Sequence, residues 1–334
     1  MNNSKLKFIK FIPFSATLKR AKVRGLRETF KVILKTFSFY LLSPIHMIRG
    51  ISYKICRALF KSAIVEVNGR KMRLNLKDEG ICMDLFIYRK REPTSTDYLV
   101  SSNILKEGDV VLDIGANIGY YTLLESKLVG PSGKVYAIEP VSANVKILKM
   151  NIKLNDCKNV EVFRVAMGDK KGKTKLYISE KCNVSAVQRR AAKGSAGEYR
   201  IVGEERVDLM TIDSFLKDKC TPNLIRMDVE GCEYNIIKGA SNTLKKNVKI
   251  LMEIHPYMMT HEQLVEMLEM LEKNNFKVKI AICEEKVRGS WIAECFMHKV
   301  YKKRKMILTN ITMAKLQKWL TNKRIIPHVL FSKE

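Results

Sequence analysis

Short apolar runs alternate with helix-like stretches between residues 110 and 282, and this alternation limits the folds open to the chain. Residues 110–114, 135–139 and 160–165 are short runs rich in Val and Ile, typical of buried strands. Residues 142–155 carry apolar side chains at helical spacing. Repeated strand–helix–strand units predict a mostly parallel sheet with right-handed crossovers and helices on both faces.

The remaining predicted elements continue this order. We expect further strands over 223–229, 248–254, 276–282 and near 293–300, and helices over 119–128, 232–245 and 260–274. Glycine-rich residues 166–206 interrupt the alternation, which indicates a hairpin and loops there. The predicted fold class is therefore α/β, with a doubly wound sheet of seven mostly parallel strands.

Two segments flank this core. Residues 64–74 predict a hairpin, because the pair Asn68-Gly69 accepts positive φ at both centres of a type I′ turn. A strand or helix over 81–91 and a helix over 94–105 lead into the core. The chain thus divides into four parts. They are a basic, partly amphipathic N-terminal extension (1–61), a hairpin-and-helix segment (62–105), a core domain (106–300) and a basic C-terminal extension (301–334).

The formal net charge of +27 is concentrated at the two ends. Residues 1–61 hold 14 basic residues and one acidic residue, and residues 299–334 hold ten basic residues and one acidic residue. The stretch between them carries only +5. Such a distribution is typical of an ordinary domain whose ends meet an anionic surface, and it is equally compatible with lysine-rich ends that serve solubility.

An uncharged, largely apolar run covers residues 36–48, which is too short to span a bilayer. Pro44 interrupts it and no small-residue cleavage site follows, so a signal peptide is not indicated. Two interpretations stay open: a helix packed on the domain, or an interfacial helix that makes peripheral contact with the inner face of a membrane. Both predict a cytoplasmic protein.

The eight cysteines include no Cys-x-x-Cys pair, and no histidine lies at zinc-ligand spacing from them. We interpret them as reduced thiols. An oxygen-rich Mg²⁺ site formed by Asp228, Glu230 and His255 is an alternative that the local pattern supports poorly. The sequence analysis therefore predicts no metal.

The first core strand ends in an Asp-x-Gly-x-Asn-x-Gly turn, from Asp113 to Gly119. Open α/β sheets bind ligands beyond the carboxyl ends of their strands, and Gly115 and Gly119 let the backbone turn sharply there. Dinucleotide folds use Gly-x-Gly-x-x-Gly to hold a pyrophosphate, whereas these two glycines are four residues apart. The second strand ends in Glu139, whose carboxylate can accept hydrogen bonds from both hydroxyls of a ribose.

Five ordered blocks carry a family resemblance. They are residues 110–122, 137–140 with Asn144, 166–169, 225–233 with Gly239-Ala240, and 251–255. Together these blocks resemble the motifs of class I S-adenosylmethionine-dependent methyltransferases, and more narrowly the FkbM-type family. The resemblance covers roughly residues 90–256, with Arg226 where lysine is frequent.

The resemblance implies a Rossmann-like fold and the methylation of hydroxyl groups on sugars, glycans or similar metabolites, with S-adenosylmethionine as cofactor. It also implies a cofactor site in which one turn borders the methionyl part, a carboxylate holds the ribose and two residues flank the adenine. The implied cofactor-binding residues, in chain order, are Asp113, Gly115, Asn117, Gly119, Glu139, Pro140, Ala166 and Met167.

A hydroxyl acceptor needs a base within hydrogen-bond reach, because it is a poor nucleophile until deprotonated. His255 is the first candidate, since the ordinary pKa of histidine lies near neutrality, and Asp228 is the second. Glu230 is a candidate acceptor-binding residue at the same strand ends. Glu92, Asn183 and Ser185 are further candidates, because loops held by a rigid sheet often bind the acceptor.

Two other classes of function are compatible with parts of the sequence. A nucleic-acid (RNA) methyltransferase would fit the charge, but enzymes that methylate exocyclic amines commonly carry Asp/Asn-Pro-Pro-Tyr/Phe where this chain has Asp228-Val229-Glu230-Gly231. Nucleic acid is therefore an unlikely partner. A non-catalytic, membrane-associated module that keeps the fold is disfavoured by the presence of Gly115, Gly119 and Glu139.

Overall fold

The computed structural model describes residues 48–78, 80–180, 187, 200–284, 305–322 and 325–333. The chain divides into two compact units, and every labelled element below belongs to the larger one. The predicted strand near 293–300 and most of the predicted N-terminal extension lie outside the described residues.

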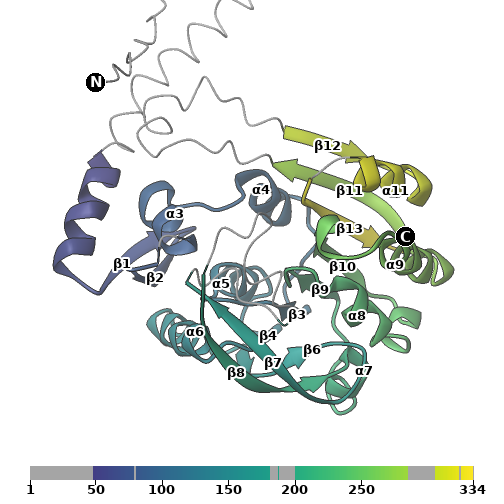
Figure 1. Cartoon of the computed structure of the whole chain (residues 1–334), viewed down its shortest axis with the longest axis horizontal. Helices are drawn as coiled ribbons and strands as arrows, with labels where there is room; N and C mark the ends of the chain where they lie inside the picture. Colours follow the sequence, from purple (N-terminus) through teal and green to yellow (C-terminus); the bar gives the residue numbers. More distant parts are fainter. Residues whose placement is uncertain are drawn as a thin grey trace, which may run out of the picture. The chain divides into compact units, whose positions relative to one another are not determined.

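A large, mostly parallel sheet forms the centre of the larger unit (Figure 1). Among the described residues it has eight strands in the order β12-β11-β13-β10-β9-β3-β4-β5. The five parallel strands are β5 (Val160–Phe163), β4 (Lys134–Ile138), β3 (Val110–Ile114), β9 (Leu224–Met227) and β10 (Lys249–Glu253). The chain reverses direction across the sheet at β3, which places the predicted turn after β3 at a topological switch point.

The C-terminal end of the chain differs from the prediction. A basic extension is predicted over residues 301–334, but the described residues among them form β12 (Lys305–Thr309), α11 (Met313–Asn322) and β13 (Pro327–Ser332). β13 lies inside the sheet and pairs antiparallel with β10 on one side and β11 (Lys277–Glu284) on the other. Two strands of the described sheet, β12 and β13, are not among the seven predicted, and the predicted strand near 293–300 lies outside the described residues. β12 is an edge strand and pairs with β11.

Helices cover both faces of the sheet, as the alternating pattern predicted. Neighbouring strand residues such as Val111 and Leu112 belong to different hydrophobic cores, because successive side chains point to opposite faces. One core joins the sheet to the hairpin and to α3 (Ile81–Tyr88), α4 (Pro93–Ser101) and α5 (Tyr120–Leu128), with α6 (Ser142–Leu154) beside them. The other joins it to α7 (Ile212–Phe215), α8 (Glu233–Lys238), α9 (His261–Lys273) and α11.

Two smaller sheets complete the unit. The predicted hairpin is present as β1 (Ser62–Val67) and β2 (Arg70–Asn75), with φ of 52° at Asn68 and 72° at Gly69. The irregular region after β5 forms a three-stranded sheet of β6 (Ala166–Met167), β8 (Ile201–Met210) and β7 (Gly172–Ser179). Short 3₁₀ turns, η3 (Thr243–Lys245) and η4 (Pro256–Met258), follow α8 and β10.

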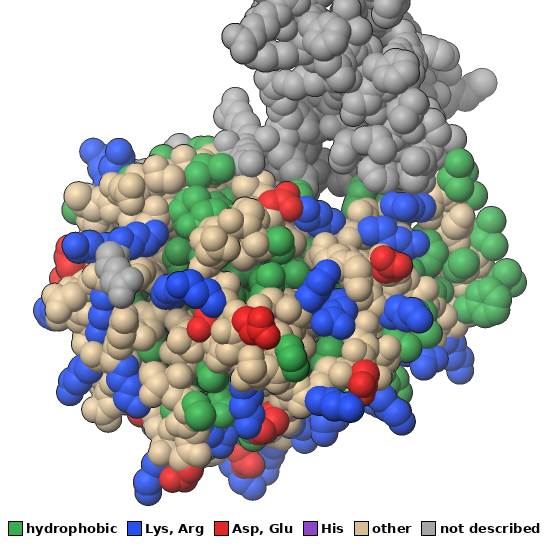
Figure 2. All heavy atoms as spheres, turned by 180° about the vertical axis from the view of Figure 1, so that it is seen from behind, with side chains coloured by type: hydrophobic (Ala, Val, Ile, Leu, Met, Phe, Trp, Pro, Cys, Tyr) green, Lys and Arg blue, Asp and Glu red, His purple; other side chains and the backbone are tan. Residues whose placement is uncertain are grey.

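The surface carries more basic than acidic side chains. On the face drawn in Figure 2, Lys and Arg are spread among apolar and neutral side chains instead of forming one continuous stripe. A helix over residues 48–59 exposes Ile51, Ile55 and Leu59 at helical spacing. Within the described ranges, no helix combines the length and the apolar character needed to cross a bilayer.

Candidate active site

The turn after β3 is held between its two neighbouring strands. The backbone N–H groups of Gly115 and Ala116 both donate to the carbonyl oxygen of Ile138, at 3.0 Å each. Gly115 adopts φ of 86°, and a Cβ there would lie 1.9 Å from the carbonyl oxygen of Asp228. Glycine is therefore required at this position both by the backbone conformation and by the close approach of the chain after β9.

Glu139 closes β4 beside this turn, and its carboxylate is buried. Its oxygens accept hydrogen bonds from the backbone N–H of Asn117 at 2.8 Å and of Val141 at 2.9 Å, and from the Asn144 side chain at 3.4 Å. Burial raises the pKa of Glu139 to about 7, although these hydrogen bonds act in the opposite direction. A carboxylate offers about four acceptor positions, so Glu139 keeps capacity for a ribose hydroxyl.

These groups open into one cavity at the carboxyl ends of β3, β4 and β9. Its lining includes Gly115, Ala116, Asn117, Glu139, Pro140, Asn144, Ala166 and Met167. The same cavity is also lined by Arg91, Tyr120, Tyr121, Arg226, Asp228 and Glu230. Six of the eight predicted cofactor-binding residues therefore line a single cavity. The remaining two are Asp113 and Gly119.

Asp113 and Gly119 shape the cavity from outside it. Asp113 is fully buried, accepts a hydrogen bond from Thr122 Oγ1 at 2.6 Å and pairs with Arg226 Nη1 at 3.1 Å. Gly119 begins α5 with φ of 95° and lies so close to Leu148 that a Cβ would come within 2.7 Å of its methyl group. Both residues position the turn without facing the cavity.

Arg226 joins the two halves of the site. Its guanidinium pairs with Asp113 at 3.1 Å and with Asp228 Oδ2 at 3.5 Å. It also lies over the ring of Tyr121, 3.8 Å from the centroid, where a cation–π contact stabilises it. The places of Tyr121 and Arg91 in the cavity wall are not predictable from the sequence, because only the fold brings their elements to the strand ends.

His255 is placed differently from what a general base requires. It is 2% exposed and does not line the cavity. Its Nδ1 lies 2.6 Å from Glu233 Oε1, and its Nε2 lies 3.5 Å from Glu230 Oε2. Burial alone would lower the pKa of His255, but Glu230 and Glu233 together raise it well above its ordinary value. Asp228 lines the cavity whereas His255 does not, so the geometry favours Asp228 as the base.

The other predicted acceptor residues fall in three places. Glu230 lines the cavity at φ of 48°, and burial raises its pKa to about 7. Glu92 is nearly buried just outside the cavity, where Tyr121 Oη donates to its carboxylate at 2.8 Å and Arg91 Nε pairs with it at 2.5 Å. Asn183 and Ser185 lie outside the described residues.

Comparison with known proteins identifies the domain. Residues 113–278, about half of the chain, match the model of the methyltransferase FkbM domain. The chain belongs to the FkbM-type family of S-adenosylmethionine-dependent methyltransferases. The resemblance found in the sequence is thus confirmed at the level of family, fold and cofactor.

Curated relatives match a shorter stretch. A protein-L-isoaspartate O-methyltransferase of Ignicoccus hospitalis is 30% identical over 112 residues, which cover 33% of this chain and 52% of the relative. Methyltransferase 1 of Beauveria bassiana is 24% identical over 147 residues, which cover 39% of this chain and 57% of the relative. The chain therefore spans about half the length of these relatives.

Similar solved structures include an S-adenosylmethionine-dependent O-methyltransferase from Thermotoga maritima. It is 17% identical with a TM-score of 0.39, and the match covers 81% of this chain and 77% of that chain. Another is TYW2 of M. jannaschii in complex with AdoMet, 16% identical with a TM-score of 0.41, covering 81% and 85%.

The observed site fits S-adenosylmethionine in two respects: the glycine turn leaves no room for a side chain, and the Glu139 carboxylate retains acceptor capacity. We expect cofactor affinity to fall as the pH drops below about 7, since the ionised form of Glu139 accepts ribose hydrogen bonds best. The affinity then falls by up to roughly tenfold per pH unit, as long as the pH stays above the pKa that Glu139 has in the complex with the cofactor.

Isothermal titration with S-adenosylmethionine over a pH series measures this effect. Glu139→Gln should bind about ten- to a hundredfold more weakly at neutral pH, in line with the loss of a hydrogen bond to a charged group, and its affinity should not respond to pH near 7. An equally steep pH dependence in Glu139→Gln would assign the titration to another group.

Proposed function

We propose that this methyltransferase acts on a hydroxyl oxygen of a sugar, glycan or other small metabolite, with Asp228 as the general base. The proposal rests on one observation: two carboxylates besides Glu139, those of Asp228 and Glu230, line the same cavity. S-adenosylmethionine supplies the methyl group as an activated sulfonium. What this chain must add is alignment of the acceptor and removal of its proton.

The electrostatics of Asp228 suit this role. Burial raises the pKa of Asp228 to about 6, and the Glu253 carboxylate adds to this, whereas Arg226 opposes it. Its ionised form therefore predominates at neutral pH, and its basicity exceeds that of an ordinary aspartate. A base whose pKa lies near the working pH transfers protons most effectively.

The same carboxylates bear on the choice of acceptor. The name of the isoaspartate-methylating relatives implies a carboxylate acceptor for those proteins. Such an acceptor needs no base, and Asp228 and Glu230 would repel it. A neutral hydroxyl needs the base and can donate a hydrogen bond to it. The charge of the cavity wall thus supports a hydroxyl acceptor for this chain.

His255 and Glu233 fit a positioning role in this proposal. The protonated imidazole lies between Glu233 and Glu230, so it holds the Glu230 carboxylate in place at the cavity wall. Glu233 is fully buried at the start of α8 and accepts a hydrogen bond from the Gly231 N–H at 3.3 Å. These contacts fix the sharp turn that follows β9.

We expect Asp228→Asn to lower kcat by about a hundredfold or more while cofactor affinity stays within a few-fold of wild type. Asparagine keeps the shape of the side chain but cannot accept the acceptor proton. The wild-type rate should rise as the pH increases through about 6 and then level off, because only the ionised Asp228 is a base. Steady-state kinetics across pH measures both effects.

Asp208→Asn provides the matched control, since it makes the same chemical change at an exposed position on β8. It should leave kcat and the pH profile unchanged. Wild-type turnover in Asp228→Asn, with the acidic limb of the profile intact, would remove Asp228 from the mechanism and leave Glu230 as the candidate base.

The acceptor class is tested directly with deuterated-methyl S-adenosylmethionine. Glycan, lipid, small-metabolite, protein and RNA fractions of a cell extract are each incubated with the purified protein, and the products are analysed by mass spectrometry. Label on a hydroxyl oxygen of a glycan or metabolite supports the proposal. Label confined to RNA, or to protein carboxyl groups, would overturn it.

A further inference from the structure

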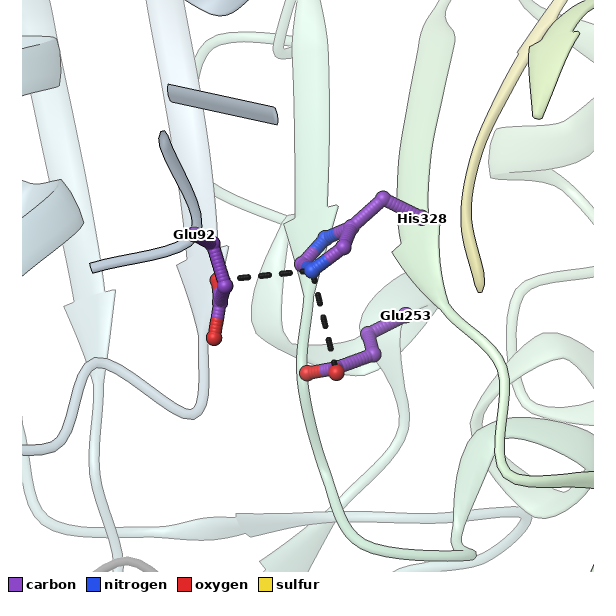
Figure 3. A group of neighbouring side chains, drawn as sticks. All are labelled: Glu92, Glu253 and His328. Carbon is purple, nitrogen blue, oxygen red and sulfur yellow. Dashed lines mark ion pairs between the residues drawn. The ribbon is translucent and has the colours of Figure 1, made fainter. Parts of the chain in front are cut away.

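Three potential metal ligands, Glu92, Glu253 and His328, converge in the described part of the chain. His328 on β13 lies between two carboxylates, with its Nε2 3.3 Å from Glu92 Oε2 and 3.7 Å from Glu253 Oε1. Figure 3 shows both carboxylates directed at the same imidazole nitrogen. Glu92 precedes α4 and Glu253 ends β10, so three separate parts of the chain supply the cluster.

The strand register accounts for two of these ligands. Glu253 and His328 are directly paired across the antiparallel β10–β13 ladder, so the backbone itself places them side by side. The third ligand, Glu92, comes from the opposite side and sits at a left-handed φ of 44°. All three side chains are largely shielded from solvent, with 8%, 13% and 6% of Glu92, Glu253 and His328 exposed.

The spacing of the donor atoms suits a small cation. First-row metal ions bind imidazole nitrogen and carboxylate oxygen at about 2.0–2.2 Å, so ligand atoms around one ion lie about 3.0–3.5 Å apart. The observed separations of 3.3 and 3.7 Å are close to that range. The separation of 3.7 Å is also too long for a hydrogen bond between His328 and Glu253.

A second group of potential ligands adjoins the first and shares Glu253 with it. The ligand atoms of Asp228, Glu253 and His255 all lie within 4.8 Å of one another, as do those of Glu92, Glu253 and His328. Asp228 also lines the cofactor cavity. The shared carboxylate therefore connects the cluster to the place where the acceptor is expected.

Glu253 is the least compensated carboxylate of the cluster. Glu92 pairs with Arg91 at 2.5 Å, whereas among the described residues the ion pairs of Glu253 are limited to His328, at 3.7 Å. A largely buried carboxylate with its cation at this distance is costly, so a cation bound between Glu253 and His328 would stabilise the cluster.

We propose that Glu92, Glu253 and His328 bind a divalent first-row transition-metal ion such as Mn²⁺, Fe²⁺ or Zn²⁺. A mixed set of one imidazole and two carboxylates suits these ions better than Ca²⁺, which takes oxygen ligands alone. The two carboxylates directed at the imidazole favour a positive charge between them, which the metal ion would supply.

This inference revises the prediction of no metal. The Mg²⁺ alternative considered from the sequence used Asp228, Glu230 and His255, but not His328, which is 75 residues from Glu253 in the sequence. The site does not depend on the proposed acceptor, because metal binding can be measured without it. A metal ion there would lie beside the acceptor position, where it could lower the pKa of a bound hydroxyl.

Titration of the chelator-treated full-length protein with Mn²⁺, followed by electron paramagnetic resonance, tests the proposal. Wild type should bind one ion, with a spectral coupling to an imidazole nitrogen. Glu253→Gln should weaken binding by at least about tenfold, and His328→Gln should do the same and abolish the nitrogen coupling. His261→Gln is the matched control, because His261 is an exposed histidine on α9, and it should bind like wild type.

Two results would overturn the proposal. The first is wild-type Mn²⁺ binding no tighter than that of Glu253→Gln when both proteins give the same folded circular-dichroism spectrum. The second is an imidazole coupling that persists in His328→Gln. In either case the three residues form an ion-paired cluster that joins β13 to the chain before α4. Neither result would bear on the identity of the methyl acceptor, which the labelling experiment decides separately.

Discussion

A chain that ends after Ile326, and therefore lacks β13, is expected not to fold. β13 is an interior strand, and all six of its residues are buried. Its removal would leave the facing edges of β10 and β11 without hydrogen-bond partners and would empty the space filled by Val329, Leu330 and Phe331.

The expected loss exceeds the stability of an ordinary domain. Burying each large apolar side chain contributes about 1.5–3 kcal/mol, and each unpaired buried backbone group costs about 1–3 kcal/mol. Domains of this kind are stable by only about 5–15 kcal/mol in total. Loss of one interior strand is therefore sufficient to unfold this unit.

Circular dichroism and thermal unfolding measure the effect. A chain that ends after Lys333 is the matched control, since it lacks only Glu334, and it should unfold cooperatively like wild type. A cooperative transition at the wild-type temperature in the chain ending at Ile326 would show that β13 is dispensable, contrary to the sheet order given above.

Gly115→Ala is expected to abolish detectable cofactor binding and to destabilise the fold by about 2–5 kcal/mol. The added methyl group would lie 1.9 Å from the carbonyl oxygen of Asp228, and the position requires φ of 86°. A left-handed backbone costs a non-glycine residue about 1–2 kcal/mol, and overpacking typically costs a further 1–3 kcal/mol. The opposing atom belongs to the backbone, so a side-chain rearrangement cannot relieve the clash.

Denaturant unfolding and isothermal titration with S-adenosylmethionine measure the two effects. Gly203→Ala is the control, because its Cβ would meet only Ile178 at 4.0 Å and its φ is not left-handed. It should change stability by less than about 1 kcal/mol and leave the affinity unchanged. Wild-type affinity in Gly115→Ala would mean that the turn after β3 does not border the cofactor.

The sequence was most informative where structure is local. Apolar periodicity predicted the parallel strands β3, β4, β5, β9 and β10, because each is a short buried run beside a helix or turn signal. The hairpin was predictable from Asn68-Gly69 for the same reason. The cavity residues around Gly115 and Glu139 could be found because they follow directly after two such strands.

The features that depend on distant pairing could not be predicted. Nothing near Pro327 indicates that β13 inserts between β10 and β11, since strand order depends on long-range packing. The ion pair of Arg226 with Asp113 joins residues 113 positions apart. The surroundings of His255 were unpredictable for a related reason: its ordinary pKa suggested a base, but its burial beside two carboxylates is a tertiary property.

The central claim is that S-adenosylmethionine binds between the turn at Gly115 and the carboxylate of Glu139. A crystal structure of the protein with S-adenosylhomocysteine, the methyl-transfer product, tests it most directly. We predict ribose hydroxyls within hydrogen-bond distance of Glu139 and the adenine beside Met167. Ordered ligand elsewhere, with protein or solvent filling the space between Gly115 and Glu139, would contradict the account.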